Sequence, residues 1–206
     1  MLHGGFESIN VTHSNNLSTF VPKPFFNEDN LSDYLQYNIK ILKNDFIAYD
    51  TLENSELVNV FIPYVFINNY LFDTFGSFEY KHTSTILVER LLHETSSSEN
   101  VNFYVNVEKD IFQIVVIKAK KIEFFNTFNY KTKEDFIYYI LFAAEQLNLN
   151  PEELKLYFIN GIEKESELYE IVFKYIKNVR FFKSNYSIPK ELKLSNHSYF
   201  TLINQY

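Results

Sequence analysis

Side chains suited to catalysis or metal binding are few in this chain, and their spacing matches no known motif. The five histidines form no His-x-His or His-Glu-x-x-His pair, and His82 and His93 share no helical face with a carboxylate. The chain has no cysteine, which excludes disulfides, thiol catalysis and cysteine-ligated zinc. It also contains no Gly-x-Ser-x-Gly elbow, no Gly-x-x-x-x-Gly-Lys-Ser/Thr loop and no Gly-x-Gly-x-x-Gly fingerprint. We therefore expect no catalytic residues, no cofactor and no metal ion.

Two turns hold residues that could contact a ligand. Asp110 lies at the tip of an expected hairpin, and Asn160 and Gly161 separate an expected strand from an expected helix. Each has a structural interpretation as well. Asp110 is then an ordinary polar turn residue, and Gly161 allows the positive φ that a turn requires.

The second half of the chain predicts a strand-strand-strand-helix-strand-helix-strand order. Residues 101–107 alternate apolar and polar side chains, which predicts a strand with one buried face. Residues 111–117 are nearly all apolar and predict a central strand buried on both faces. The remaining expected elements are strands at 122–125, 154–159 and 179–182, a helix from Thr132 to Leu147 that begins with a capping box to Asp135, and a helix over 168–175.

The first half predicts part of the same order of elements, followed by a polar linker at 95–100. The expected strands are 57–62 and 78–81, with extended segments at 19–21 and 45–52. The expected helices are 31–37, 85–92 and one that begins near Pro63 and ends at Gly76.

Residues 126–149, Asn-Thr-Phe-Asn-Tyr-Lys-Thr-Lys-Glu-Asp-Phe-Ile-Tyr-Tyr-Ile-Leu-Phe-Ala-Ala-Glu-Gln-Leu-Asn-Leu, resemble a signature segment of an uncharacterised bacterial family of unknown function. That family has an actin-like, ribonuclease H-like ATPase fold, and the resemblance extends over roughly residues 6–206. It implies an α/β protein of two actin-like lobes, residues 1–95 and 101–206, of which the first is abbreviated and incomplete at its start.

The same resemblance implies where a nucleotide would bind. Actin-like ATPases hold phosphates in two glycine-containing hairpins, whereas the hairpin of the second lobe, residues 107–111, has no glycine. If a nucleotide binds at all, Asp110 would be a relic of the phosphate loop, and Asn160 with Gly161 would lie near the adenosine-binding turn. A nuclease of the ribonuclease H type is a weaker alternative, because Glu108, Asp110 and Glu123 do not clearly converge.

Composition limits the partners. The net charge is −7, so nucleic acid is disfavoured, and Lys118–Lys121, the densest basic run, is interpreted as a solvated hairpin turn. The most apolar run, residues 58–72, is interrupted by asparagines and Pro63, and no membrane span is expected. Without a signal peptide or cysteines, the expected location is the cytoplasm.

Aromatic residues are abundant, with 22 Phe and 16 Tyr. Five tyrosines are expected on polar faces or beside turns, where they could anchor a protein interface: Tyr104, Tyr130, Tyr138, Tyr169 and Tyr199. An AT-rich codon bias is an equally good explanation of the composition. Strand edges and apolar surface on the first lobe predict self-association or a protein partner there, with Tyr49 and Phe61 as contact candidates.

The function that these observations favour is a non-catalytic actin-like protein with degenerate nucleotide loops that acts as a protein-interaction module. The alternative is a nucleotide-binding ATPase or kinase-type protein with atypical phosphate loops. Enzymatic activity is not expected.

Overall fold

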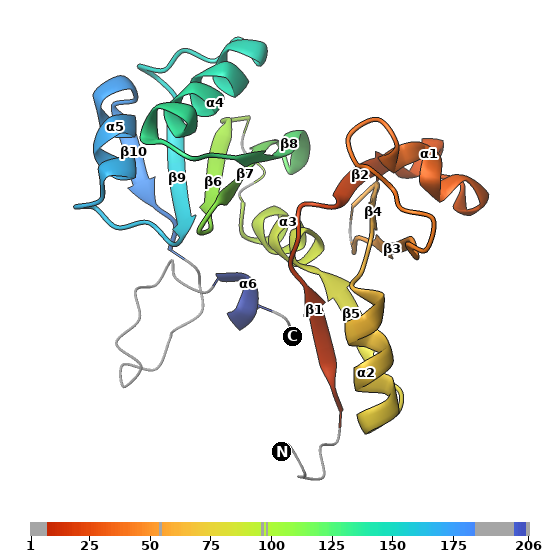
Figure 1. Cartoon of the computed structure of the whole chain (residues 1–206). Helices are drawn as coiled ribbons and strands as arrows, with labels where there is room; N and C mark the ends of the chain where they lie inside the picture. The colour runs from red at the N-terminus through yellow and green to blue at the C-terminus, as the bar shows by residue number, and fades with distance from the viewer. Residues whose placement is uncertain (1–7, 54, 96, 98, 184–199, 205–206) are drawn as a thin grey trace. The chain divides into compact units, whose positions relative to one another are not determined.

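The computed structural model describes residues 8–53, 55–95, 97, 99–183 and 200–204. The chain divides into two compact units, and each is considered by itself (Figure 1). The first unit comprises residues 1–89 with 204–206, and the second comprises residues 90–203. The division falls within one helix, α3 (Thr83–Glu94).

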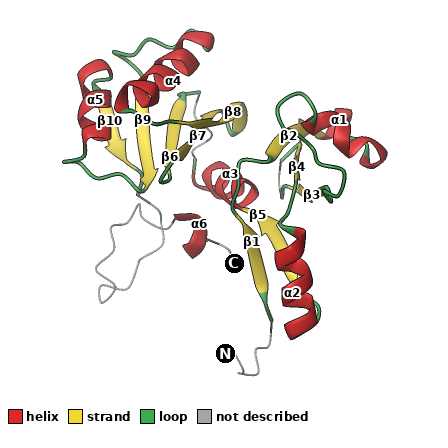
Figure 2. Cartoon of the chain, viewed as in Figure 1, coloured by secondary structure: helices red, strands yellow, loops and turns green. Residues whose placement is uncertain are grey.

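The first unit is mixed α/β (Figure 2). Its strands are β1 (Asn10–His13), β2 (Ser18–Pro22), β3 (Ala48–Thr51), β4 (Leu57–Phe61) and β5 (Glu79–His82). Its helices are the short 3-10 turns η1 (Lys23–Phe25) and η2 (Glu28–Asn30), then α1 (Leu31–Leu35), α2 (Val65–Phe75) and the first part of α3.

These strands form two separate ladders. β2 and β3 pair antiparallel with either edge of β4, and β1 pairs parallel with β5. Val58, Val60 and Ile62 point from β4 into a small core with α1, while Asn59 and Phe61 occupy the opposite face, since side chains alternate along a strand. Every element predicted for this half is present, with boundaries shifted by a few residues, and β1 is an additional strand.

The ends of α2 illustrate how local sequence sets its limits. Pro63 precedes the helix, which begins at Val65 rather than at the proline. Gly76 ends it with φ at 83°, a conformation that strains any residue with a Cβ, and donates its N–H to the Phe72 carbonyl at 2.9 Å. The prediction that Gly76 terminates this helix is confirmed.

In the residues that the structure describes, the second unit has five strands and three helices after α3. The strands are β6 (Asn102–Val107), β7 (Ile111–Lys118), β8 (Lys121–Asn129), β9 (Lys155–Asn160) and β10 (Asn178–Phe181). The helices are α4 (Lys133–Gln146), α5 (Glu167–Tyr175) and the short α6 (Phe200–Ile203).

The five strands form one sheet in the order β10-β9-β6-β7-β8. β6, β7 and β8 make an antiparallel meander, and β9 and β10 continue the sheet in parallel. This confirms the predicted order of elements and the central place of residues 111–117. The expectation that 101–107 buries one face is wrong, because β6 is flanked on both sides and its Tyr104 and Asn106 are buried as well.

α4 covers the sheet with the predicted apolar stripe. Phe136, Ile140 and Ala143 are buried against Phe112 of β7 and its neighbours, with the rings of Phe112 and Phe136 4.5 Å apart. The predicted capping box is confirmed, because the Thr132 hydroxyl accepts from the Asp135 N–H at 3.1 Å and the Asp135 carboxylate accepts from the Thr132 N–H at 3.1 Å.

The basic run at Lys118–Lys121 is the β7–β8 turn. Ala119 and Lys120 both have positive φ, at 48° and 60°, as a two-residue hairpin turn of the primed type requires. The interpretation of this run as a hairpin turn is confirmed. No helix in the described residues is long and apolar enough to cross a membrane.

Candidate functional site

The predicted ligand residues lie at one edge of the five-stranded sheet. β6 and β9 are parallel neighbours, so the hairpin that follows β6 and the turn that follows β9 meet at their carboxyl ends. The backbone N–H of Gly161 donates to the Val107 carbonyl at 3.0 Å, which joins the two turns directly. In open α/β sheets, the edge formed by the carboxyl ends of the strands is the usual place for a ligand.

Asp110 presents its side chain to solvent, and its backbone is fixed by Tyr130. The Tyr130 N–H donates to the Asp110 carbonyl at 3.2 Å, and the Tyr130 hydroxyl lies 2.9 Å and 3.0 Å from the carbonyls of Glu108 and Lys109. The hairpin is therefore rigid. Burial raises the pKa of the Glu108 carboxyl.

Asn160 has a structural role that its sequence context did not reveal. Its φ is 61°, in the left-handed region, and its side-chain amide donates to Asn106 while its oxygen accepts from the Phe200 N–H at 2.8 Å. Asn106 in turn donates to Gln113 at 2.9 Å. The amide of Asn160 is thus bonded within the protein on both sides.

Gly161 is required by close packing. The residue with positive φ in this turn is Asn160, so the expected reason for the glycine is wrong. A Cβ at Gly161 would lie 3.2 Å from the carbonyl oxygen of Val107, which is closer than ordinary van der Waals contact. The glycine allows the β9–α5 connection to approach β6.

A pocket of about 420 Å³ opens beside this turn. It is lined by residues 160–163 together with Glu165 and Ser166. Ser166 caps α5, since its hydroxyl accepts from the Tyr169 N–H at 3.3 Å. Two carboxylates, Glu163 and Glu165, line the pocket, and their charge would repel a phosphate group.

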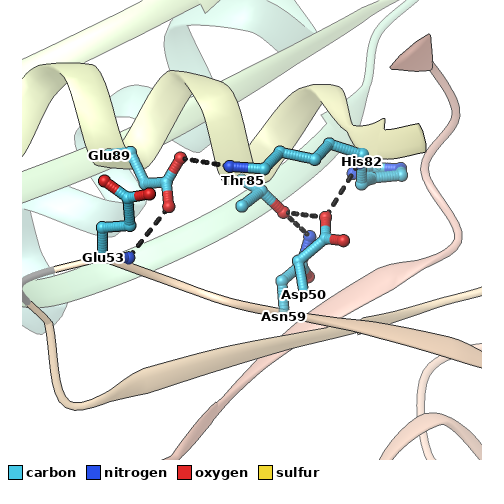
Figure 3. A network of polar contacts seen from close by, with 7 residues as sticks. Asp50, Glu53, Asn59, His82, Thr85 and Glu89 are labelled. Carbon is cyan, nitrogen blue, oxygen red and sulfur yellow. Dashed lines mark hydrogen bonds and ion pairs between the residues drawn. The ribbon is translucent and has the colours of Figure 1, made fainter. Parts of the chain in front are cut away.

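A second cluster of polar side chains lies in the first unit, where β3 and β4 meet the start of α3 (Figure 3). One carboxylate oxygen of Asp50 accepts from the His82 N–H at 2.9 Å and from the Thr85 hydroxyl at 2.6 Å. Thr85 also accepts from Asn59 at 2.9 Å. Asp50 is therefore held beside the start of α3 by His82 and Thr85. Burial raises the pKa of its carboxyl.

His82 is fully buried at the end of β5, and its hydrogen bonds fit a neutral imidazole with one protonated nitrogen. Its Nδ1 accepts from the Ser84 N–H at 3.1 Å, so its Nε2 carries the proton shared with the Asn15 oxygen at 3.2 Å. Burial lowers the pKa of His82 to about 3. Sequence analysis considered His82 only as a metal ligand and had no signal for this role.

His13 is held in the same way between β1 and α2. Its Nδ1 accepts from the Tyr64 N–H at 3.4 Å and its Nε2 lies 2.9 Å from the Asn68 oxygen. Burial also lowers the pKa of His13. The side chains of this second cluster are hydrogen-bonded inside the first unit, although the buried Oδ1 of Asn59 has no hydrogen-bond partner in the described part of the chain. These bonds stabilise the unit. No group of three or more potential metal ligands occurs among the described residues.

The tyrosines expected at exposed positions divide into three groups. Tyr138 is exposed, whereas Tyr130 is half-buried and Tyr104 and Tyr169 are buried, so the expectation is wrong for the last two. Tyr199 lies outside the described residues. Two residues of the first unit were expected to contact a partner. Tyr49 is 36% exposed, whereas Phe61 is fully buried, which excludes it as a surface contact.

The exposed apolar surface is instead on α2. Seven of its eleven residues are apolar or aromatic, its one charged residue is Asp73, and none of its residues is buried. Phe66, Tyr70 and Phe72 are 73%, 68% and 61% exposed. Phe66 and Tyr70 share a face at i and i+4, whereas Phe72 points elsewhere, so the helix is apolar on more than one side. Sequence analysis predicted this helix but not its exposure.

The family match agrees with the resemblance noted in the sequence. A family described as "Protein of unknown function (DUF3822)" matches residues 1–179. No curated protein matches the chain.

Comparison with solved structures identifies the fold. The chain is similar to a Bacteroides thetaiotaomicron protein with an actin-like ATPase fold and unknown function, at 21% identity and a TM-score of 0.79, over 86% of this chain and 69% of that one. It is also similar to a chain of the PilM-PilN type IV pilus biogenesis complex, at 10% identity and a TM-score of 0.54, over 97% and 79% of the two chains. At these identities the likeness establishes the actin-like fold and nothing further.

Proposed function

This chain belongs to the DUF3822 family of proteins of unknown function, and we propose that it is a non-catalytic protein-interaction module built on two actin-like lobes, residues 1–95 and 101–206. The observation that carries the proposal is the exposed apolar surface of α2. This helix carries large apolar side chains on more than one side, and such helices are normally covered by other parts of a protein. A second copy of the chain is the partner that we propose for it.

The size and charge of the surface suit a protein contact. The exposed rings of Phe66 and Tyr70, which share one face of α2, together present on the order of 300 Å². Apolar patches of that size commonly mark interaction sites, and about 800 Å² per partner is usual in a stable complex. With Asp73 as its only charge, α2 can meet an identical helix with little electrostatic repulsion.

The sheet beside α2 supports the same conclusion. β1 and β5 form a parallel ladder of two strands, and parallel sheets are normally covered on both faces. Two strands alone are marginal in water. The contact of His13 with Asn68 joins this ladder to α2, so a partner on α2 would stabilise both elements. The PilM-PilN complex, which contains a similar fold, is itself a protein–protein assembly, and this is compatible with the proposal.

The experiment compares oligomeric state with matched surface changes. Light scattering after size exclusion should give twice the mass of one chain for the wild type and a single-chain mass for the double change Phe66→Ser and Phe72→Ser. The control is Tyr138→Ser with Phe142→Ser, a pair of exposed rings on α4. A monomeric wild type would contradict self-association, and the same dimer in both variants would exclude α2 as the contact.

Nucleotide binding is the second candidate, and one observation favours it. The hairpin of Asp110 and the turn of Asn160 and Gly161 do meet at the carboxyl edge of the sheet. Three features oppose it: the hairpin has no glycine, the Asn160 amide is engaged by the protein, and Glu163 and Glu165 line the adjacent pocket. Phosphate binding needs backbone N–H groups at close range without competing carboxylates.

A further inference from the structure

A larger groove of about 620 Å³ lies along β10, on the opposite side of β9 from β6, and it is open to solvent. Tyr157 of β9 and Tyr169 of α5 contribute aromatic walls, and Lys164, Arg180 and Lys183 contribute three cations. Among the described residues that line it, none is acidic. Grooves of this size with apolar walls and a few charged groups are typical of ligand sites.

The three cations have no ion-pair partner in the part of the chain that the structure describes. In the same unit, Lys133 pairs with Glu167 at 3.0 Å and Lys177 pairs with Glu152 at 3.1 Å. Lys164, Arg180 and Lys183 make no such contact and are exposed. Three unpaired cations around one groove are notable in a chain of net charge −7. They create a local positive potential that attracts an anionic partner.

The chain also separates its charges around this groove. Lys164 lines the groove, whereas its neighbours Glu163 and Glu165 line the smaller pocket beside Gly161. The loop between β9 and α5 therefore directs its positive side chain to one site and its negative side chains to the other. Of the two sites, the groove is the positively charged one.

The positions of the cations indicate the shape of the ligand. Arg180 lies within β10, and Lys183 follows the end of that strand by two residues. Lys164 comes from a separate loop. Charges spread in this way match several carboxylates spaced along a chain better than one phosphate group, and the aromatic walls can accept apolar side chains between them.

From this charge complementarity, we propose that the groove binds an extended acidic peptide segment of a partner protein, with Arg180, Lys183 and Lys164 contacting its carboxylates. This proposal rests on the proposed function as an interaction module and adds a second, chemically different contact site to it. The α2 surface selects an uncharged apolar partner, whereas this groove selects negative charge.

The test is fluorescence anisotropy of the full-length chain with a labelled peptide that alternates Glu or Asp with Phe or Leu. Arg180→Glu combined with Lys183→Glu should weaken binding at least about tenfold, because attraction becomes repulsion. Binding should also weaken as salt is raised. The control is Lys177→Glu, which reverses an exposed lysine of the same unit that pairs with Glu152 outside the groove, and it should leave binding nearly unchanged.

The outcomes separate this site from its alternatives. A peptide with Lys in place of Glu and Asp should not bind. Absence of binding by the acidic peptide, or equal loss in the Lys177→Glu control, would overturn the proposal. Displacement of the peptide by inorganic phosphate or Mg-ATP at constant ionic strength would assign the groove to a phosphate ligand instead. The double change Phe66→Ser and Phe72→Ser should keep peptide binding, so a failure of the α2 proposal does not affect this result.

Discussion

At the scale of single residues, buried His82 makes the first unit sensitive to acid. The imidazole is neutral in the fold, with its pKa lowered to about 3, and returns to about 6.5 on unfolding. The unfolded chain therefore binds more protons below pH 6.5, and the stabilising effect present above that value is lost as the pH falls. We expect the free energy of unfolding to decrease by about 2 kcal/mol from this residue between pH 7 and pH 5.

Urea denaturation at the two pH values measures this effect. His82→Gln removes the titration and should flatten the pH dependence, whatever its effect on stability at pH 7. His93→Gln is the control, because His93 is exposed. The account of His82 is wrong if both variants retain the pH dependence of the wild type.

Asn160 provides a second residue-scale prediction. Asn160→Ala removes two hydrogen bonds and places an alanine at a φ of 61°, so we expect a loss of about 2 kcal/mol in the free energy of unfolding. Asn178→Ala, which removes an exposed bond to the Glu152 carbonyl, should cost less than about 0.5 kcal/mol. Equal losses in denaturant unfolding would show that the Asn160 amide is not structural.

The sequence located this turn but could not assign its role. Asn160 and Gly161 indicate a turn by residue type alone, because both tolerate unusual backbone angles. The sequence does not show which of the two has positive φ, or that Asn106 and Gln113 continue the chain of bonded amides. Both features depend on the parallel pairing of β6 with β9, which brings together residues distant in the sequence.

At the scale of elements, the start of α4 is set by its capping box. Thr132→Ala should destabilise the second unit by about 1 kcal/mol, because the Asp135 N–H loses its acceptor. Thr132→Ser keeps the hydroxyl and should retain most of the stability. Thermal or urea unfolding followed by circular dichroism gives the comparison, and a serine variant as unstable as the alanine variant would contradict the capping role.

The capping box was predictable because both partners lie within one turn of the chain.

The burial of a strand was harder to predict from the sequence. Residues 111–117 are apolar except for Gln113 and were correctly predicted as central, whereas 101–107 alternate like a half-exposed strand. β6 is buried on both faces because Asn106 is bonded to Asn160 and Gln113, and Tyr104 shares a hydrogen bond with Thr95 at 2.8 Å. Polar side chains that satisfy one another can occupy a core, and periodicity alone does not reveal it.

At the scale of the whole molecule, we expect an actin-like fold that does not bind nucleotide. Isothermal titration with Mg-ATP should show no binding tighter than about 1 mM, because no glycine-containing phosphate hairpin is present in the second unit and its adjacent pocket is acidic. A micromolar dissociation constant that is lost in Asp110→Ala would favour the nucleotide-binding alternative.

Hydrogen exchange at two protein concentrations tests whether α2 is the contact surface between two copies of the chain. An exposed helix of eleven residues has little stability of its own, so its amides exchange quickly unless a partner covers it. We predict that amides of residues 67–75 are protected at high concentration and become unprotected on dilution, while those of α4 stay unchanged. Exchange at α2 that is independent of concentration would contradict the account.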